Sequence, residues 1–236
     1  MRHSRTVATA VALVALLAAG TAGAQAPKKG SPNNDKRATQ QKAASAPDPI
    51  GTAAVADRLA RYGEEKKDPV LLIAAARLKQ DLAETSAEFK HKAIGGNDKS
   101  TKDRAKERTA EALLARAREL SAGRADLVAL ADDVGKSRSR GVVGGYRYAY
   151  KTLAGLGRHV YTETFQRGEV GAVGISGDGD TDLDLYVYDE AGNLICRSEN
   201  LGDDEVCRFT PYFTTPFRIV VVNRGLLANN YVMRTN

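Results

Sequence analysis

The sequence has 236 residues, of which 42% are hydrophobic and 27% charged, and its formal net charge at pH 7 is +6. A chain of this length can form one large or two small domains, each with a core of its own. It contains only three histidines, so a Ser-His-Asp or Cys-His catalytic arrangement has almost no base to use. The spacing typical of histidine-rich metal sites is also absent.

The N-terminus has the composition of a secretory signal peptide. Two arginines precede an apolar run at residues 7–19, and a small-x-small cleavage site follows at residues 22–24. A retained membrane anchor is the alternative, but it would need a longer apolar run. We therefore predict a signal peptide over residues 1–24, cleaved after Ala24, and a periplasmic or secreted protein without a transmembrane segment in the mature chain.

The next part of the chain changes from polar to helical. Residues 25–50 consist mainly of Lys, Asn, Gln, Ser, Ala and Pro, which offer too little apolar surface to bury, so we predict a disordered leader. Residues 51–136 are predicted to form a small, Ala-rich bundle of four helices. The first of these shows helical spacing and ends at Gly63, in the place of a C-cap glycine.

Three further helices are predicted in this domain. Asp68 followed by Pro69 predicts the start of the second helix, because an N-cap residue precedes a proline at the first helical position. Ser100 with Asp103 resembles a capping box ahead of a long third helix. The fourth is short and carries its apolar residues at helical spacing between Leu127 and Val134.

Residues 137–157 are rich in Gly, Ser, Arg and Tyr, which predicts a hinge between two domains. The hinge either stays flexible or contributes an edge strand on which Tyr146, Tyr148 and Tyr150 alternate. We favour partial docking of this strand, because tyrosines at a period of two rarely all face solvent.

From residue 158 to residue 236 the periodicity is that of strands. Gly, Pro, Asn and Asp turns separate seven short segments of alternating pattern, at residues 159–166, 170–176, 183–189, 194–198, 206–209, 217–222 and 231–235. Apolar residues on both faces of residues 217–222 predict a central strand that is covered on both sides. Cys196 and Cys207 are predicted to form a disulfide between neighbouring antiparallel strands, since an even pair in an exported protein is most simply a disulfide.

The same region contains the segments YTETFQRGE, GDGDTDLDLYVYDEAGNL, CRFTPYFTTPFRIVVVN and ANNYVMRT. Their order and content resemble the bacterial pre-peptidase C-terminal domain, a small β-sandwich often appended to secreted proteases. The resemblance covers about the last third of the chain and implies a jelly-roll-like antiparallel β-sandwich. It also implies a non-catalytic part, because the appended domain does not carry the activity of those proteases. The expected fold class is thus α+β with two domains, the helical bundle and the sandwich.

An acidic turn precedes the segment DLDLYVYD, with carboxylates at alternate positions. Such carboxylates can converge on a hard cation, and exported proteins meet calcium at concentrations that suit weak sites. The predicted calcium ligands are Asp178, Asp180, Asp182 and Asp184, with a contribution from Asp203, Asp204 or Glu205. The pattern departs from an EF-hand, which needs glycine where Leu183 stands. The alternative is a solvated acidic turn that discourages pairing at the sheet edge.

Charge divides unevenly along the chain. Residues 25–156 carry 26 Lys and Arg against 17 Asp and Glu, while residues 157–236 carry 7 against 12. A basic helical half could attract anionic polymers, but interleaved acids on solvated helix faces explain the pattern better. Nucleic acid is disfavoured further by the predicted export and by the lack of aromatic residues interleaved with the basic ones.

These observations favour an exported, non-enzymatic binding protein whose sandwich holds a protein or polysaccharide partner, with calcium as a candidate ion. We assign no catalytic residues. Tyr186 and Tyr188, opposite the apolar face of their strand, are the predicted partner-binding residues; the alternative is that this face is covered. Two other functions stay open: an envelope accessory or chaperone-like subunit for another secreted protein and, more remotely, a hydrolase that uses the acidic cluster.

Overall fold

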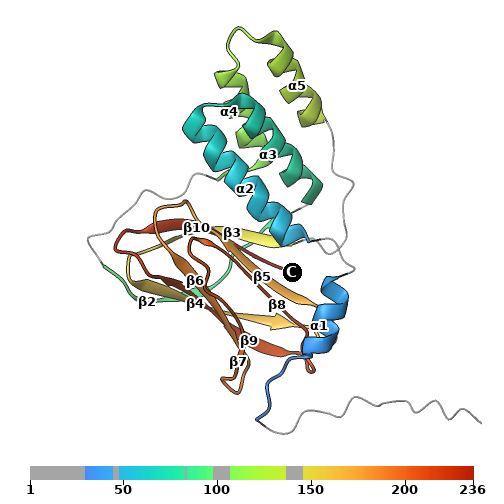
Figure 1. Cartoon of the computed structure of the whole chain (residues 1–236), viewed down its shortest axis with the longest axis vertical. Helices are drawn as coiled ribbons and strands as arrows, with labels where there is room; N and C mark the ends of the chain where they lie inside the picture. The colour runs from blue at the N-terminus through green and yellow to red at the C-terminus, as the bar shows by residue number, and fades with distance from the viewer. Residues whose placement is uncertain (1–29, 45–47, 83, 98–106, 137–145) are drawn as a thin grey trace, which may run out of the picture.

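The computed structural model describes residues 30–44, 48–82, 84–97, 107–136 and 146–236. Within these residues the fold is α+β, with five helices and two five-stranded sheets (Figure 1). The helices are α1 (Lys36–Ala43), α2 (Pro49–Lys66), α3 (Pro69–Leu82), α4 (Ala110–Leu120) and α5 (Ala125–Lys136). The strands are β1 (Thr85–Ser86), β2 (His91–Gly95), β3 (Arg147–Leu153), β4 (Gly157–Phe165), β5 (Gly171–Ser176), β6 (Leu183–Tyr188), β7 (Leu194–Ser198), β8 (Asp204–Phe209), β9 (Thr215–Asn223) and β10 (Asn229–Thr235). The predicted signal peptide lies outside the described residues.

The first sheet, called sheet A below, has the strand order β1-β3-β10-β5-β8, and the second, sheet B, has the order β2-β4-β9-β6-β7. All pairs of neighbouring strands are antiparallel except β1 with β3, which are parallel. In the register of sheet B, Tyr186 of β6 lies opposite Val220 of β9, which lies opposite Val160 of β4. The strands predicted from residue 159 onward are all present, with ends that differ by a few residues.

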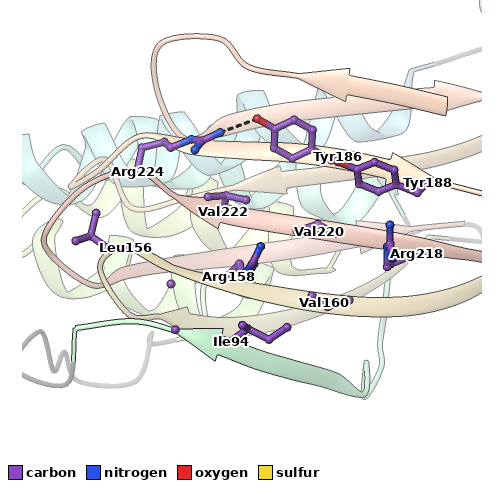
Figure 2. Close-up of a pocket in the computed structure, with 12 residues that line it drawn as sticks. Ile94, Leu156, Arg158, Val160, Tyr186, Tyr188, Arg218, Val220, Val222 and Arg224 are labelled. Carbon is purple, nitrogen blue, oxygen red and sulfur yellow. Dashed lines mark hydrogen bonds between the residues drawn. The ribbon is translucent and has the colours of Figure 1, made fainter. Parts of the chain in front are cut away.

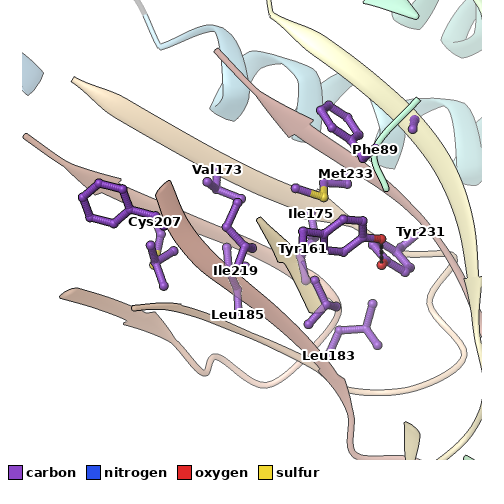
Figure 3. Close-up of a cluster of buried hydrophobic side chains, with 14 of the residues drawn as sticks. Phe89, Tyr161, Val173, Ile175, Leu183, Leu185, Cys207, Ile219, Tyr231 and Met233 are labelled. Carbon is purple, nitrogen blue, oxygen red and sulfur yellow. Dashed lines mark hydrogen bonds between the residues drawn. The ribbon is translucent and has the colours of Figure 1, made fainter. Parts of the chain in front are cut away.

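The two sheets share one hydrophobic core, to which both contribute alternate residues (Figure 3). In β6, Leu183, Leu185 and Val187 are completely buried, as the period-two pattern predicts. The inward face of β9 adds Ile219 and Val221. This strand is central, as predicted, but only its inner face is covered. Its outer face remains partly exposed, so the prediction of cover on both sides was wrong.

A second hydrophobic cluster joins α2, α3, α4 and α5, and it is rich in alanine. The second helix begins at Pro69, as predicted, and the side chain of Asp68 accepts a hydrogen bond from the backbone N–H of Val70. Gly63 is not a C-cap: it lies inside α2, where a side chain would collide with Leu72 of α3. The predicted capping box at Ser100 and Asp103 lies outside the described residues, and the helix described there, α4, has Thr109 as its N-cap.

Helix α2 covers the outer face of sheet A. A Cβ at Gly174 of β5 would come within 2.2 Å of Ile50, so the glycine makes room for the helix. The interface also contains buried charges. Asp57 of α2 lies 2.6 Å from the guanidinium of Arg234 in β10 and 2.7 Å from the ammonium of Lys79 in α3. The helices therefore dock on the sheet through a close steric fit and an ion network.

Two segments of the sheets come from regions that we predicted to be helix and hinge. Strands β1 and β2 follow α3 directly and lie at the edges of sheets A and B, inside the stretch predicted as a helical domain. Strand β3 pairs along its whole length with β10, so sheet A already includes Arg147–Leu153, ahead of residue 158. The alternation of Tyr148 and Tyr150 indicated this strand correctly.

The predicted leader also contains ordered structure. Helix α1 lies beside β8 (Figure 1), apart from the other helices. The side-chain oxygen of Asn33 accepts hydrogen bonds from the backbone N–H groups of Tyr212 and Phe213, and the Asn34 side chain accepts one from Thr210. Polar side chains thus hold this segment through backbone hydrogen bonds, which a prediction based on apolar content alone overlooked.

Among the described residues, no helix is both long and apolar enough to cross a membrane.

Candidate functional site

The outer face of sheet B carries a shallow groove of about 690 Å³ (Figure 2). Alternation along β6 buries its leucines and turns Tyr186 and Tyr188 toward this face. The groove is lined by residues of four neighbouring strands and two turns: Ile94, Gly95, Leu156, Gly157, Arg158, Val160, Tyr186, Tyr188, Arg218, Val220, Val222 and Arg224. The two predicted partner-binding tyrosines therefore lie together in one groove on an open sheet face.

The tyrosine rings lie side by side along the strand. Their centroids are 6.4 Å apart and their planes differ by 22°. The guanidinium carbon of Arg218, directly opposite Tyr188 on β9, lies 4.7 Å from the centroid of the Tyr188 ring. At this distance the cation is attracted to the ring face. The groove thus combines flat aromatic surface with a cation held in place.

The end of the groove near Arg224 is fixed by hydrogen bonds. Arg224 pairs through Nε with the carboxylate of Asp184 at 2.5 Å. It also donates from Nη2 to the hydroxyl of Tyr186 at 2.7 Å, the hydrogen bond drawn in Figure 2. The Tyr186 hydroxyl in turn lies within hydrogen-bonding distance of Asp184 and Glu199. Burial, together with these two carboxylates, raises the pKa of Tyr186 above its ordinary value. The hydroxyl therefore stays protonated and its orientation is set before any partner binds.

The four predicted calcium ligands do not converge on one point. Asp184 lies on the outer face of sheet B, paired with Arg224. Asp178 accepts a hydrogen bond from the backbone N–H of Asn230, and Asp182 accepts one from Gly202. Asp180 follows Asp178 in the same turn. Within the described ranges, no group of three or more His, Cys, Asp or Glu side chains is arranged to hold a metal ion.

Asp203 and Asp204, which were predicted to add carboxylates to the calcium site, are paired with an arginine. Arg61 of α2 pairs with Asp203 at 3.4 Å and with Asp204 at 3.2 Å, and it also donates to the carbonyl of Gly177. Asp203 accepts hydrogen bonds from the backbone N–H of Gly179 and from the side chain of Asn229. These carboxylates organise the turn and bind helix α2.

The remaining predicted contributor, Glu205, points toward the interior. It is fully buried and hydrogen-bonded to Ser198 and to both the backbone and the side chain of Asn200. Burial raises the pKa of Glu205. The residue holds the β7–β8 connection in place.

The disulfide between Cys196 and Cys207 is present, with the two Cα atoms 5.8 Å apart. Its setting differs from the prediction. Strand β7 pairs with β6 in sheet B and β8 pairs with β5 in sheet A, so the two cysteines join the sheets and do not lie on paired strands. The bond ties together the edges of both sheets close to the strand that carries the tyrosines.

A cluster of aromatic polar side chains, buried except for the exposed His91, was not predicted. The His91 and His159 rings have centroids 4.2 Å apart, and His159 Nδ1 lies 2.8 Å from the hydroxyl of Tyr231, which also contacts the hydroxyl of Tyr161. Burial lowers the pKa of His159 to about 3, so the ring is neutral at physiological pH. The sequence offered one indication of this cluster: His159 and Tyr161 are two residues apart in β4, so their side chains lie on the same, buried face of the strand.

The arginines of the helices are mostly paired. Arg116 binds Glu64 and Glu119, Arg118 binds Asp132, and Arg124 binds Asp126. Such interleaving is the arrangement of a solvated helix face, in agreement with the interpretation favoured from the sequence. These arginines are therefore matched by acidic side chains on the helices themselves.

Comparison with known proteins adds little to this description. No family model and no curated protein matches the chain. Among solved structures, the chain is similar to a de novo designed double-stranded β-helix determined by solution NMR, at 19% sequence identity and a TM-score of 0.26. The match covers 38% of this chain and 99% of the designed protein.

Proposed function

We propose that this is an exported, non-enzymatic binding protein that holds an extended polymer across the outer face of sheet B. The observation that carries the proposal is the groove itself: a sheet face, left open by the described parts of the chain, on which two stacked tyrosine rings lie beside an apolar floor. Clustered aromatic residues with oriented polar groups are typical of binding surfaces. A groove that runs over several strands suits a chain-like partner better than a compact molecule.

Contacts within the protein also hold the side chains of the groove in place before a partner binds. The Asp184, Arg224 and Tyr186 network fixes one end of it, and Arg218 is held against Tyr188. A partner would therefore meet side chains that are already ordered, which reduces the entropy lost on binding.

The proposal extends to the fold and the compartment. We infer that the two sheets form a jelly-roll-like sandwich of the pre-peptidase C-terminal type and that the helices form a second domain. Support comes from the shared core of the sheets and the separate alanine-rich core of the helices. A disulfide in a chain whose N-terminus has the composition of a signal peptide supports a periplasmic or secreted location.

Retention of the purified protein on immobilised polysaccharides tests the function. The panel contains neutral and acidic polysaccharides and collagen, and each is tested with the natural protein and with a Tyr186→Ala, Tyr188→Ala double variant. We expect retention on a polysaccharide that weakens at least about tenfold in the double variant, the loss typical of aromatic anchors.

Tyr62→Ala is the matched control, because Tyr62 is 53% exposed on α2, away from sheet B. It should bind as tightly as the natural protein. Equal retention of the double variant and the natural protein would overturn the assignment of the groove as the binding surface.

A further inference from the structure

The outer face of sheet B is positively charged, although this part of the chain is acidic. Residues 157–236 contain 7 arginines against 12 aspartates and glutamates. Four of the arginines lie on strands or turns at this face: Arg158, Arg197, Arg218 and Arg224. Lys92 of β2 lies on the same face. Among the described residues, Asp184 and Glu199 are the acidic side chains paired with them there. More basic than acidic side chains therefore lie around the groove, although acidic residues outnumber basic ones in this part of the chain.

Two of the four arginines have no carboxylate partner among the described residues. Arg224 is matched by Asp184 and Arg197 by Glu199. For Arg158 and Arg218, by contrast, no ion pair with an acidic side chain exists within the portion of the chain that the structure describes. Both line the groove, on β4 and β9 (Figure 2). An anionic partner would therefore find two uncompensated guanidinium groups.

Between these arginines the floor of the groove is apolar. Val160 and Val220 are directly paired across β4 and β9, and the tyrosine rings continue the surface on β6. A sugar ring has apolar C–H faces and polar edges, so it can lie on such a floor while its edge groups reach the arginines. The planar fork of a guanidinium matches a carboxylate in two parallel hydrogen bonds.

The groove also holds a residue in an unfavourable conformation. Leu156 has a φ of 59°, in the left-handed region that costs a side-chain-bearing residue about 1–2 kcal/mol, and its side chain is 57% exposed. Burial within the fold therefore does little to offset this cost. The conformation places an exposed leucine at the end of the groove, beside Arg158, where it extends the apolar surface available to a partner.

We propose that the partner held in this groove is an acidic polysaccharide with carboxylated sugar units, whose carboxylates bind Arg158 and Arg218 and whose ring faces pack on Tyr186, Tyr188 and the valine floor. The proposal rests on the polymer-binding function argued above and adds the chemical class of the polymer. Single-stranded nucleic acid is the competing anionic polymer; the predicted export of the protein disfavours it, and the test below distinguishes the two.

Polygalacturonate and its fully methyl-esterified form provide the test, because they share a backbone and differ in charge. We expect the natural protein to bind polygalacturonate and to bind the ester at least about tenfold more weakly. Raising salt from about 0.1 M to about 1 M should weaken binding to polygalacturonate alone, since screening shortens the range of charge interactions from about 10 Å to about 3 Å.

Single substitutions test which residues are responsible for the preference for the charged polymer. Arg158→Gln and Arg218→Gln should each weaken binding to polygalacturonate about fivefold, as expected for an exposed ion pair near its upper limit, and each should weaken binding to the ester by a smaller factor. Arg167→Gln is the matched control: it removes the same charge from an exposed turn outside the groove and should bind like the natural protein. Leu156→Gly should bind both polymers more weakly while unfolding at an equal or higher temperature, a combination that a purely structural role would not produce.

The outcomes separate the two proposals. Equal binding of both polymers, still lost in the tyrosine double variant, would overturn the acidic class and leave the polymer-binding function intact. Tighter binding to a single-stranded oligonucleotide or to anionic lipid vesicles than to polygalacturonate would also overturn it. Absence of binding to any polysaccharide of the panel, with or without charge, would overturn both.

Discussion

The carboxylate of Asp57 in α2 lies 2.6 Å from the guanidinium of Arg234 in β10, and both side chains are almost completely shielded from solvent, with 3% and 2% exposed. Lys79 and Glu84 extend the pair into a network of two cations and two anions. Burial opposes the ionisation of Asp57, but the charges of Arg234 and Lys79 outweigh it and hold the pKa of Asp57 below its ordinary value. The helices and sheet A are therefore joined by charges that depend on one another.

Asp57→Ala tests this dependence. It leaves Arg234 and Lys79 buried without their common partner, so we expect a loss of about 3–5 kcal/mol in the free energy of unfolding, measured by urea denaturation. Arg124→Ala is the control, because it breaks the pair with Asp126, in which both side chains are 63% exposed. That change should cost less than about 1 kcal/mol. Similar losses in the two variants would contradict the account.

The contact between Gly174 and Ile50 gives a second prediction about the same interface. Gly174→Ala should destabilise the protein by about 1–3 kcal/mol, because the new methyl group overlaps the Ile50 side chain. Ile50→Ala should be destabilising by itself, but it opens the space that the alanine needs. In a double-mutant cycle read by urea denaturation, we expect the combined loss to be smaller than the sum by about 1 kcal/mol or more. Additive losses would show that α2 does not rest on Gly174.

His159 predicts a pH dependence of stability. Burial lowers its pKa to about 3 in the folded protein, against about 6.5 in an unfolded chain. Between these values the unfolded state binds a proton that the folded state does not, so stability is full above about pH 6.5 and falls as the pH drops toward 3. A difference of one bound proton changes the free energy of unfolding by up to about 1.4 kcal/mol per pH unit.

Urea denaturation between pH 7 and pH 4 measures this contribution as the difference between the natural protein and His159→Gln. The glutamine has no titrating group but can still hydrogen-bond to Tyr231, and carboxylates titrate in both proteins. We expect the difference in the free energy of unfolding to shrink steadily as the pH falls. Parallel pH profiles would mean that His159 is protonated in the folded state.

The acidic turn gives a prediction about calcium. A bound ion at about 100 times its dissociation constant would add about 2.7 kcal/mol to stability, equivalent to several degrees in the midpoint of thermal unfolding. Because Arg61 and backbone N–H groups already occupy the carboxylates of Asp203 and Asp182, we expect the same midpoint in chelator and in calcium. A rise in calcium that disappears in Asp182→Ala would contradict this and restore the predicted metal site.

Local patterns in the sequence predicted the strands well, while contacts between distant segments escaped them. The alternation in β6 predicted both the buried leucines and the outward tyrosines, since a strand turns successive side chains to opposite faces. The pattern could not reveal whether the outer face was covered, because half-buried valines such as Val220 and Val222 occur in either setting. The disulfide followed from the number of cysteines, but which strands it joins depends on the sheet order.

The errors share a physical cause. Strand β1 has two residues and β2 has five, too few to show a period, and both are held by pairing with strands far along the chain. The leader is polar, yet Asn33 fixes it through hydrogen bonds to a turn that is distant in sequence. The acidic turn contacts Asp203 through the backbone of Gly179, but the arginine that pairs with Asp203 and Asp204 comes from α2. Composition and periodicity do not encode such pairings.

The most direct test of the groove as the binding surface is a titration of the methyl-labelled protein with polygalacturonate, followed by NMR. We expect the methyl signals of Val160, Val220 and Val222 to shift, because these residues form the floor of the groove. The signal of Val55, which is 43% exposed on α2, should stay in place. Shifts confined to Val55 and the helices, with the three floor valines unchanged, would contradict the account and move the binding surface to the other side of the molecule.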